Sequence, residues 1–185
     1  MSEYRIHTNY ANALYLTAKE AQVQDAVEKD MRLIRKVCEE NRKLNVVLGN
    51  PTIKEGSKID ILRDIFEPHV HPLTMLFLTY LIKKRRSVQL RGIAEAYIQQ
   101  YRKSHNIVFA EVVTAVEVNP ELIEELRQKV AHYTGKEVEL LSRVSNRMLG
   151  GYRMTFDNNM YDARIRTKIA KLRAEFSRND YEKKL

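Results

Sequence analysis

Apolar residues recur every three or four positions through the first 105 residues, and short polar breaks separate the runs. This spacing predicts amphipathic helices that turn one face toward a shared core. One long run covers residues 22–43, and its apolar positions are Val23, Ala26, Val27, Met31, Ile34 and Cys38. Further helices are expected from Thr8, across 46–48, after a capping-box sequence at 52–55, across 73–82 and across 88–104.

Two of these helices carry more apolar residues than one core-facing side needs. Residues 73–82 are apolar nearly all round, and the first helix has two competing apolar sides. The surplus residues are Tyr10, Ala13 and Leu14 in the first helix and Phe77, Tyr80 and Leu81 in the fifth. A groove between two such helices would accept an amphipathic partner helix. The alternative is that a small bundle buries all of these side chains.

The pattern changes after His105, where β-branched residues become frequent. Residues 107–118 predict a strand. Asn119-Pro120-Glu121 is typical of a helix start, because it combines a capping side chain, a proline in the first turn and an acidic residue near the positive end of the helix dipole. This helix is expected to end near Gly135, and a second strand is expected at 138–141.

A compact hairpin that leads into a C-terminal helix is predicted beyond residue 147. The adjacent glycines Gly150 and Gly151 indicate a bulge or a close approach of two backbone segments. Residues 152–156 alternate between apolar and polar, as a half-buried strand does, and residues 157–159 have turn chemistry. Asp162 stands where an N-cap is expected. The apolar positions of the last helix are Ile165, Ile169, Leu172 and Phe176.

These patterns predict an α+β fold, mostly α, in two domains. Residues 1–105 are expected to form a helical bundle, and residues 106–185 a small β-α-β-β-α domain. A charged tail from residue 178 onward is expected to fray. Because 44% of the residues are hydrophobic, the chain has enough apolar side chains for a core, which argues against wholesale disorder.

The chain has 185 residues and a formal net charge of +8, and the basic excess is concentrated in residues 83–103. The basic patch consists of Lys83, Lys84, Arg85, Arg86 and Arg91. We interpret it as the solvated end of a helix, with contact to an acidic protein or to nucleic acid as alternatives. No aromatic stacking strand or helix-turn-helix pattern accompanies the patch, which disfavours nucleic acid.

No constellation of residues indicates catalysis, a metal or a cofactor. The sequence has no glycine-rich phosphate loop and no nucleophile elbow. His69 and His71 flank prolines without matching ligands, so structural or surface roles are expected. Glu124-Glu125 is expected to offset a helix dipole rather than to act in acid–base chemistry. Cys38, the one cysteine, is expected to be a buried and inert thiol.

Membrane insertion is not expected. No apolar run approaches the ~20 residues that span a bilayer, and the N-terminus lacks the apolar stretch of a signal peptide. We therefore expect a cytosolic protein that is free to dock on a membrane complex.

Five short motifs stand in order along the chain. They are Tyr10-Ala11-x-Ala13-Leu14, Leu48-Gly49-Asn50-Pro51, the strand Glu111–Ala115, Gly135-Lys136-Glu137-Val138, and Leu149-Gly150-Gly151 followed by Asp162-Ala163 and Ile165-Arg166. Together they resemble the delta subunit of F-type ATP synthases, known in mitochondria as OSCP. Two positions depart from the family pattern: Ser145-Asn146 replaces an Asp-Pro-like pair, and Arg164 replaces a serine.

The resemblance implies a six-helix N-terminal bundle in a non-catalytic, cofactor-free subunit of the proton-translocating ATP synthase. In this family the bundle binds the amphipathic N-terminal segment of an alpha subunit against its first and fifth helices. The C-terminal domain holds the b subunits of the peripheral stalk. The protein would then lie peripherally on the cytoplasmic side of the cell inner membrane, as a stator that resists rotor torque during ATP synthesis.

Carried onto this chain, the resemblance assigns Tyr10, Ala13 and Leu14 to the alpha-subunit interface. Phe77, Tyr80 and Leu81 join them from their position on the fifth helix. The C-terminal motif, expected to define the fold with stalk contact as a further role, comprises Leu149, Gly150, Gly151, Asp162, Ile165 and Arg166. The substitution Leu14→Asp is expected to leave the isolated protein folded and to abolish binding of an alpha peptide. The alternative function is a basic nucleic-acid-binding protein that uses residues 83–103, which a steep salt dependence of binding would reveal.

Overall fold

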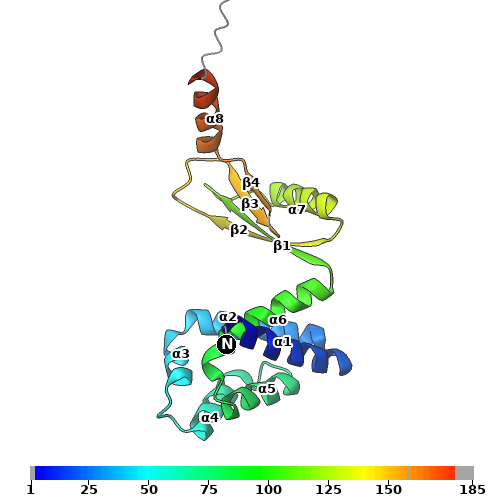
Figure 1. Ribbon diagram of the computed structural model, residues 1–185, viewed down its shortest axis with the longest axis vertical. Coiled ribbons are helices and arrows are strands. Elements are labelled where there is room, and N and C mark those ends of the chain that lie inside the picture. Colours follow the sequence, from blue (N-terminus) through cyan, green and yellow to red (C-terminus); the bar gives the residue numbers. More distant parts are fainter. Residues whose placement is uncertain (1–2, 158, 178–185) are drawn as a thin grey trace, which may run out of the picture. The chain divides into compact units, whose positions relative to one another are not determined.

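The computed structural model describes residues 3–157 and 159–177. It divides into two compact units with the boundary between His105 and Asn106, where the apolar pattern changes (Figure 1). The predicted fraying of the tail from residue 178 onward lies outside the described residues.

The N-terminal unit is a bundle of six α-helices. They are α1 (Glu3–Glu20), α2 (Gln24–Glu40), α3 (Arg42–Gly49), α4 (Glu55–Phe66), α5 (Pro72–Lys83) and α6 (Leu90–Ser104), with a 3₁₀ turn, η1 (Ser87–Gln89), before α6. Helix α6 packs against both α1 and α2. Its apolar face fills the centre of the bundle, and Ile93, Ala94, Tyr97 and Ile98 are completely buried there. Helical periodicity thus places the core as predicted.

Three helix ends differ from the sequence-based expectation. Helix α1 begins at Glu3, and the Thr8 hydroxyl donates to the Tyr4 carbonyl (2.9 Å) inside the helix instead of capping it. The predicted helix at 22–43 is interrupted at Asn41, whose backbone is not helical and whose side-chain amide donates to the Val37 carbonyl. The capping box at 52–55 is not formed, since the Thr52 hydroxyl and amide both donate to the Asn50 side chain.

The C-terminal end of α3 is fastened by a buried cation. The Lys58 ammonium and the Ser87 hydroxyl both donate to the Leu48 carbonyl, each at 2.9 Å. A helix C-terminus leaves carbonyls without intrahelical partners and carries partial negative charge, so an ammonium is stabilising there. These two bonds tie α3 to α4 and to η1.

The C-terminal unit is a four-stranded mixed sheet with α7 packed on it. Its elements are β1 (Ile107–Thr114), α7 (Pro120–Thr134), β2 (Glu137–Val144), β3 (Tyr152–Phe156), β4 (Asn159–Asp162) and α8 (Ile165–Ser177). The strand order is β2-β1-β3-β4, with β1 and β2 parallel and the other pairs antiparallel. Alternate residues of β1 face α7, and its buried residues are Val108, Ala110, Val112 and Thr114.

The predicted helix start at Asn119 is confirmed, because the Asn119 side chain accepts a hydrogen bond from the Glu121 amide (3.2 Å). The helix ends at Gly135, which adopts a left-handed conformation (φ 66°). Strand β1 ends at Thr114 rather than Val118, since the Thr114 hydroxyl bonds to the Val116 carbonyl and turns the chain. The predicted α+β, mostly α, class is confirmed, and the structure adds one strand, β4, where a turn and a helix cap were expected.

Candidate functional site

A groove runs between α1 and α5 on the surface of the N-terminal unit. We call this cavity of about 590 Å³ the helix groove. Its lining residues are Asn9, Tyr10, Ala13, Leu14 and Thr17 from α1 and Leu73, Leu76, Phe77 and Tyr80 from α5. Only Asn9 and Thr17 are not apolar or aromatic, so the groove is suited to an apolar partner rather than to a polar ligand.

The floor and the rim of the helix groove have different exposure. Leu14 and Phe77 form the floor and retain 3% and 9% of their accessible surface. On the rim, Leu76 and Tyr80 remain 67% and 47% exposed. Ala13 is exposed on the α1 side, where its small side chain leaves room for another backbone to approach. A partner placed here would remove large apolar side chains from water without disturbing the core.

An aromatic pair closes one end of the helix groove. The rings of Tyr10 and Tyr80 lie 6.4 Å apart at 55°, within the range of favourable tilted pairs. The Lys84 ammonium lies 5.5 Å from the centre of the Tyr80 ring, a cation–π distance. This end therefore combines aromatic surface with positive charge.

A buried carboxylate positions α5, the helix that supplies the exposed rim residues Leu76 and Tyr80. Asp30 of α2 is 7% exposed and accepts hydrogen bonds from the His71 amide (2.8 Å) and the Thr74 hydroxyl (2.6 Å). The His71 ring nitrogen Nδ1 caps the helix by accepting from the Leu73 amide. His71 thus has a structural role, and the first turn of α5 is held from two sides.

The structure brings together Tyr10, Ala13, Leu14, Phe77 and Tyr80 in one groove, whereas Leu81 lies in the core with 1% exposure. Sequence reasoning did not name two further lining residues of α5, Leu73 and Leu76. The signal was the four-residue spacing from Leu76 to Tyr80, which places both on one helix face. Leu14 also belongs to the buried core, so the expectation that Leu14→Asp leaves the protein folded is wrong on physical grounds: it would bury a carboxylate.

The C-terminal motif forms a tight bracket at the start of α8. The Ile165 amide donates to the Gly150 carbonyl (3.1 Å), and the Ala163 amide donates to the Tyr152 carbonyl (2.9 Å). Gly151 has φ 80°, and a methyl group there would overlap the Ala163 carbonyl oxygen. The predicted close approach of two backbone segments is therefore present, and it requires glycine.

Asp162 joins this bracket as the acceptor of several hydrogen bonds. Its carboxylate accepts from the Arg164 amide (3.0 Å), from the Arg164 guanidinium (2.6–3.0 Å) and from the Thr167 hydroxyl (3.0 Å). These bonds, chiefly those from the Arg164 side chain, hold the pKa of Asp162 well below its usual range. Because α8 begins at Ile165, Asp162 closes a turn ahead of the helix rather than serving as its N-cap. Arg164, which departs from the family pattern, supplies the main partner.

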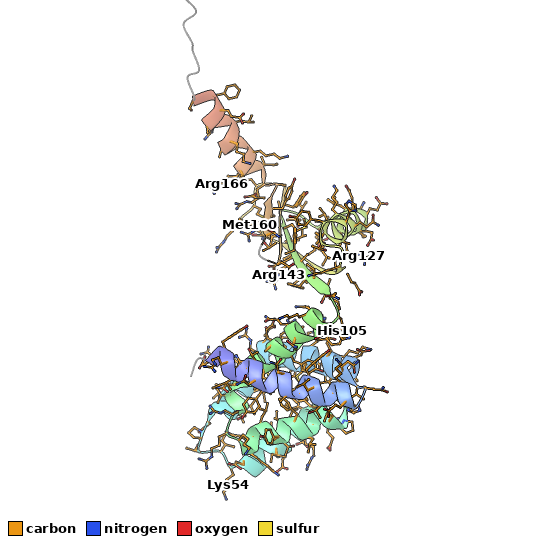
Figure 2. The ribbon with its side chains drawn as sticks, turned by 45° about the vertical axis from the view of Figure 1, so that its right-hand side comes forward. Lys54, His105, Arg127, Arg143, Met160 and Arg166 are labelled. Carbon is orange, nitrogen blue, oxygen red and sulfur yellow. The ribbon has the colours of Figure 1, made fainter. Side chains whose placement is uncertain are left out.

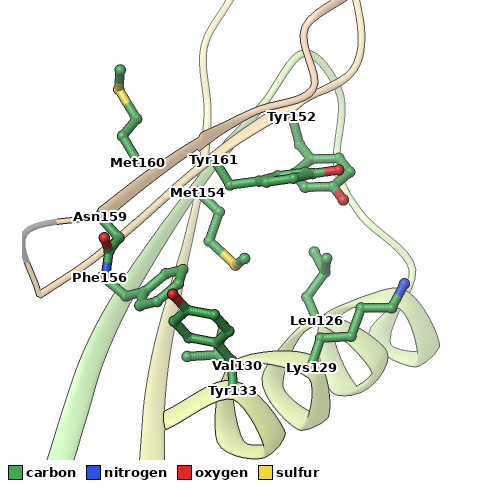
Figure 3. A pocket seen from close by; sticks show the side chains of 10 residues that line it. All are labelled: Leu126, Lys129, Val130, Tyr133, Tyr152, Met154, Phe156, Asn159, Met160 and Tyr161. Atoms are coloured by element: carbon green, nitrogen blue, oxygen red, sulfur yellow. The ribbon is translucent and has the colours of Figure 1, made fainter.

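A second groove, the sheet groove, lies beside α7 on the sheet of the C-terminal unit. It encloses about 510 Å³, and its lining residues are Leu126, Lys129, Val130, Tyr133, Tyr152, Met154, Phe156, Asn159, Met160 and Tyr161. Two ring contacts shape it in Figure 3: Tyr133 meets Phe156 edge-on at 5.8 Å, and Tyr152 stacks on Tyr161 at 5.9 Å. A helix is ~10 Å across and strands are ~4.8 Å apart, so α7 alone covers only part of four strands.

Helix α8 has an apolar stripe that is largely exposed among the described residues, although Ile165 at its start lies against Gly150. None of its residues is buried, and its side chains stand out around the helix beyond Arg166 in Figure 2. The exposed members of the stripe are Ile165, Ile169, Leu172 and Phe176. Four apolar residues at helical spacing favour a partner for this face.

The side chains of the basic patch lie on the surface near the end of α5 and the start of α6. Arg85 pairs with Glu55 at 3.6 Å and Arg91 with Glu39 at 3.5 Å, both as exposed ion pairs. Lys83, Lys84 and Arg86 are exposed and form no ion pair with the described residues. These three cations remain available to a partner.

The side chains that the sequence offered as candidates for catalysis or metal binding lie in surroundings that indicate structural roles. Cys38 is buried, and desolvation raises the pKa of its thiol to about 11, so it is not a reactive thiolate. Glu124 and Glu125 bond to Arg127, Gln128 and Lys129 on the same helix. In residues 3–157 and 159–177, no group of three or more potential metal ligands comes together. Nor does any helix of this part combine the length and apolar character needed to cross a bilayer.

Comparison with known proteins gives one consistent answer. The family model described as "ATP synthase delta (OSCP) subunit" matches residues 6–176. ATP synthase subunit delta of Chlorobium luteolum is 32% identical over 177 residues, covering 96% of this chain and 98% of that protein. The subunit delta of Carboxydothermus hydrogenoformans is 28% identical, covering 94% and 97%. A chain of the Toxoplasma gondii mitochondrial ATP synthase hexamer has the same fold, with a TM-score of 0.73, 19% identity and coverage of 96% and 98%.

Proposed function

Since this chain belongs to the ATP synthase delta (OSCP) subunit family, we propose that it joins the catalytic head of an F-type ATP synthase to the b subunits of the peripheral stalk. The family is a structural component of the peripheral stalk and is not itself catalytic. The predicted family, general function and non-enzymatic nature are thus confirmed by the comparisons. The specific contacts of each unit are our proposal.

The N-terminal unit binds the N-terminal segment of an alpha subunit, and the helix groove is its binding site. The observation that carries this assignment is the pair of large, exposed side chains, Leu76 and Tyr80, above an apolar floor. An amphipathic helix laid between α1 and α5 would cover both rim residues with its apolar face. Full burial of a side chain such as Leu76 is worth about 1.5–3 kcal/mol.

This mode of binding suits a stator. A stator has to stay attached under torque, which requires slow dissociation rather than reactive groups. Well-packed apolar anchors at the centre of an interface act mainly on the dissociation rate. The helix groove offers such anchors on two helices that the core and the Asp30 network hold in place.

The C-terminal unit contacts the b subunits through its unpartnered apolar surfaces. These are the sheet groove and the stripe of α8. The bracket of the C-terminal motif supports this role indirectly, because it fixes where α8 begins. Residues of the motif then act by positioning α8, and Leu149, which is 83% exposed, can contact a partner directly.

The protein works at the periphery of the membrane, as part of the ATP synthase complex. None of the helices described in residues 3–157 and 159–177 spans a bilayer, so attachment through other subunits fits. We place it on the cytoplasmic side of the cell inner membrane, where the catalytic head of a bacterial enzyme is found. The alternative of nucleic-acid binding has no support from the relatives, and two of its patch residues already pair with glutamates.

The test is a calorimetric titration of the full chain with a synthetic peptide that matches the N-terminal segment of the alpha subunit from the same organism. Leu76→Asp is expected to weaken binding at least a hundredfold without unfolding the protein, because Leu76 is exposed in the free chain. Leu16→Asp is the matched control, since Leu16 is 60% exposed on α1 but does not line the groove. Equal affinities for the two variants would refute the groove assignment.

A further inference from the structure

Positive charge is distributed unevenly along the helix groove. Three of the four groove-lining residues of α5, Leu73, Leu76 and Tyr80, follow one another at three- and four-residue spacing. The next positions at this spacing are Lys83 and Lys84, and side chains so spaced share one helix face. The wall that begins as apolar surface thus ends in two ammonium groups.

The structure places one of these ammonium groups against the groove itself. The Lys84 ammonium lies 5.5 Å from the ring centre of Tyr80, which lines the groove. Lys83, Lys84 and Arg86 are exposed and form no ion pair with the described residues. We call Lys83 and Lys84 the cationic end of the groove.

Within the part of the chain that the structure describes, the opposite end of the groove has no comparable cluster. It is lined by Thr17 of α1 and Leu73 of α5, and the last turn of α1 carries one charge of each sign, Lys19 and Glu20. The α1 residues beside the cationic end are also balanced, with Glu3 opposing Arg5. The difference in charge between the two ends therefore comes from α5 and the residues directly after it.

An apolar groove alone does not fix the direction of a bound helix, because the apolar stripe of a helix can pack into the groove in either of two opposite directions. We propose, building on the docking of a helix in this groove, that the bound helix has acidic residues concentrated at one end, and that this end lies over Lys83 and Lys84. The partner is therefore an amphipathic helix with an acidic terminal turn. The cationic end selects one direction of binding and speeds association, as complementary charges at an interface rim do.

The experiment uses the full chain and the peptide of the alpha subunit N-terminal segment. A nitroxide label is attached in turn to each end of the peptide, and paramagnetic broadening of the Tyr80 and Thr17 signals is recorded by NMR. We expect the label at the acidic end to broaden Tyr80 and the label at the other end to broaden Thr17. The reverse pattern, or an alpha segment without acidic residues at one end, would overturn the inference.

Affinity provides the second readout. The double variant Lys83→Glu/Lys84→Glu is expected to bind the peptide about tenfold more weakly at low salt, and the difference is expected to shrink at high salt through screening. Lys29→Glu/Lys54→Glu, which makes the same charge change at exposed sites outside the groove, is the control. If both double variants bind equally while Leu76→Asp abolishes binding, the direction inference fails and the groove assignment stands. If Leu76→Asp also binds normally, the groove assignment fails.

Discussion

The two units of this protein expose apolar surface in different ways. Among the described residues, the N-terminal unit has a core of 22 buried apolar residues, and the helix groove, with the exposed Leu76 and Tyr80 on its rim, lies over that core. The core of the C-terminal unit comprises eight buried apolar residues among those described, and an entire helix, α8, has no buried residue. The N-terminal unit thus presents a preformed groove. In the C-terminal unit, by contrast, α8 exposes apolar side chains that only a partner could cover.

This difference implies different binding physics. A groove on a packed bundle changes little when a helix enters, so its affinity depends on the exposed rim residues and not on ordering the protein. The C-terminal unit would gain more from the proposed stalk contact, because binding there would bury the stripe of α8 and the aromatic rings of the sheet groove. We therefore expect the stalk partner to stabilise the C-terminal unit more than the alpha peptide stabilises the bundle.

The largest effect is expected for Leu14→Asp, which tests whether floor and rim of the helix groove are distinct. Leu14 is 3% exposed within the bundle core, so the variant buries a carboxylate without a partner. It should destabilise the N-terminal unit by at least about 4 kcal/mol. Thermal unfolding monitored by tyrosine fluorescence and circular dichroism would show this as an early transition.

The matched control is Leu16→Asp on the same helix. Leu16 is 60% exposed, so this variant should unfold within ~0.5 kcal/mol of the native chain. Two equally stable variants would mean that the groove floor is not part of the core, and the contrast between the two units would lose its basis.

The next largest effect is expected for Gly151→Ala, which acts on the C-terminal unit alone. Gly151 combines φ 80° with a backbone oxygen where the new methyl group would lie, and a backbone atom cannot move aside as a flexible side chain can. The cost should be about 2–4 kcal/mol, and α8 should lose its fixed start. Hydrogen exchange of the α8 amides would report that loss directly.

Gly135→Ala separates strain from overlap. Gly135 also has a left-handed backbone, with φ 66°, but a methyl group there would meet nothing within 4 Å. Its cost should therefore be about 1–2 kcal/mol, from conformation alone. If the two variants cost the same, the bracket between Gly151 and Ala163 would contribute nothing beyond its backbone conformation.

The sequence predicted the bundle better than it predicted the groove, and the reason is physical. The polar residues of an amphipathic helix show which side faces solvent. Helix α6 has enough polar residues for the spacing of its apolar positions to identify the buried side. Helix α5 is apolar nearly all round, so spacing alone could not separate exposed Leu76 from buried Leu81. The prediction therefore placed the buried Leu81 in the groove and left out the exposed Leu76.

The sheet groove was even harder to predict from the sequence than the helix groove. Its existence depends on how many strands one helix covers and on β4, whose four residues were taken as a turn and a helix cap. Tyr133 was unremarkable in the sequence, and only the pairing of β3 with β4 brings Phe156 and Tyr161 into one wall with it. By contrast, the double glycine predicted a close backbone approach, because few residues other than glycine permit one.

The smallest effect is expected for Asp162→Asn, which tests whether charge contributes to the bracket that fixes α8. The pKa of Asp162 is held low in the folded chain by the Arg164 side chain, so the folded state binds a proton less readily than the unfolded state does. Its contribution is therefore fully present above the unfolded pKa of about 3.9 and is lost as the pH falls further. Because the Asp162 and Arg164 side chains keep 18% and 36% of their accessible surface, solvent screens the pair and the effect should be modest. The melting temperature of Asp162→Asn should lie below that of the native chain at pH 7. The difference should begin to narrow as the pH falls below about 4, whereas the exposed control Glu117→Gln should show no such narrowing. A constant difference across this range would assign the role of Asp162 to neutral hydrogen bonding alone, and the C-terminal unit would then hold α8 by backbone geometry rather than by charge.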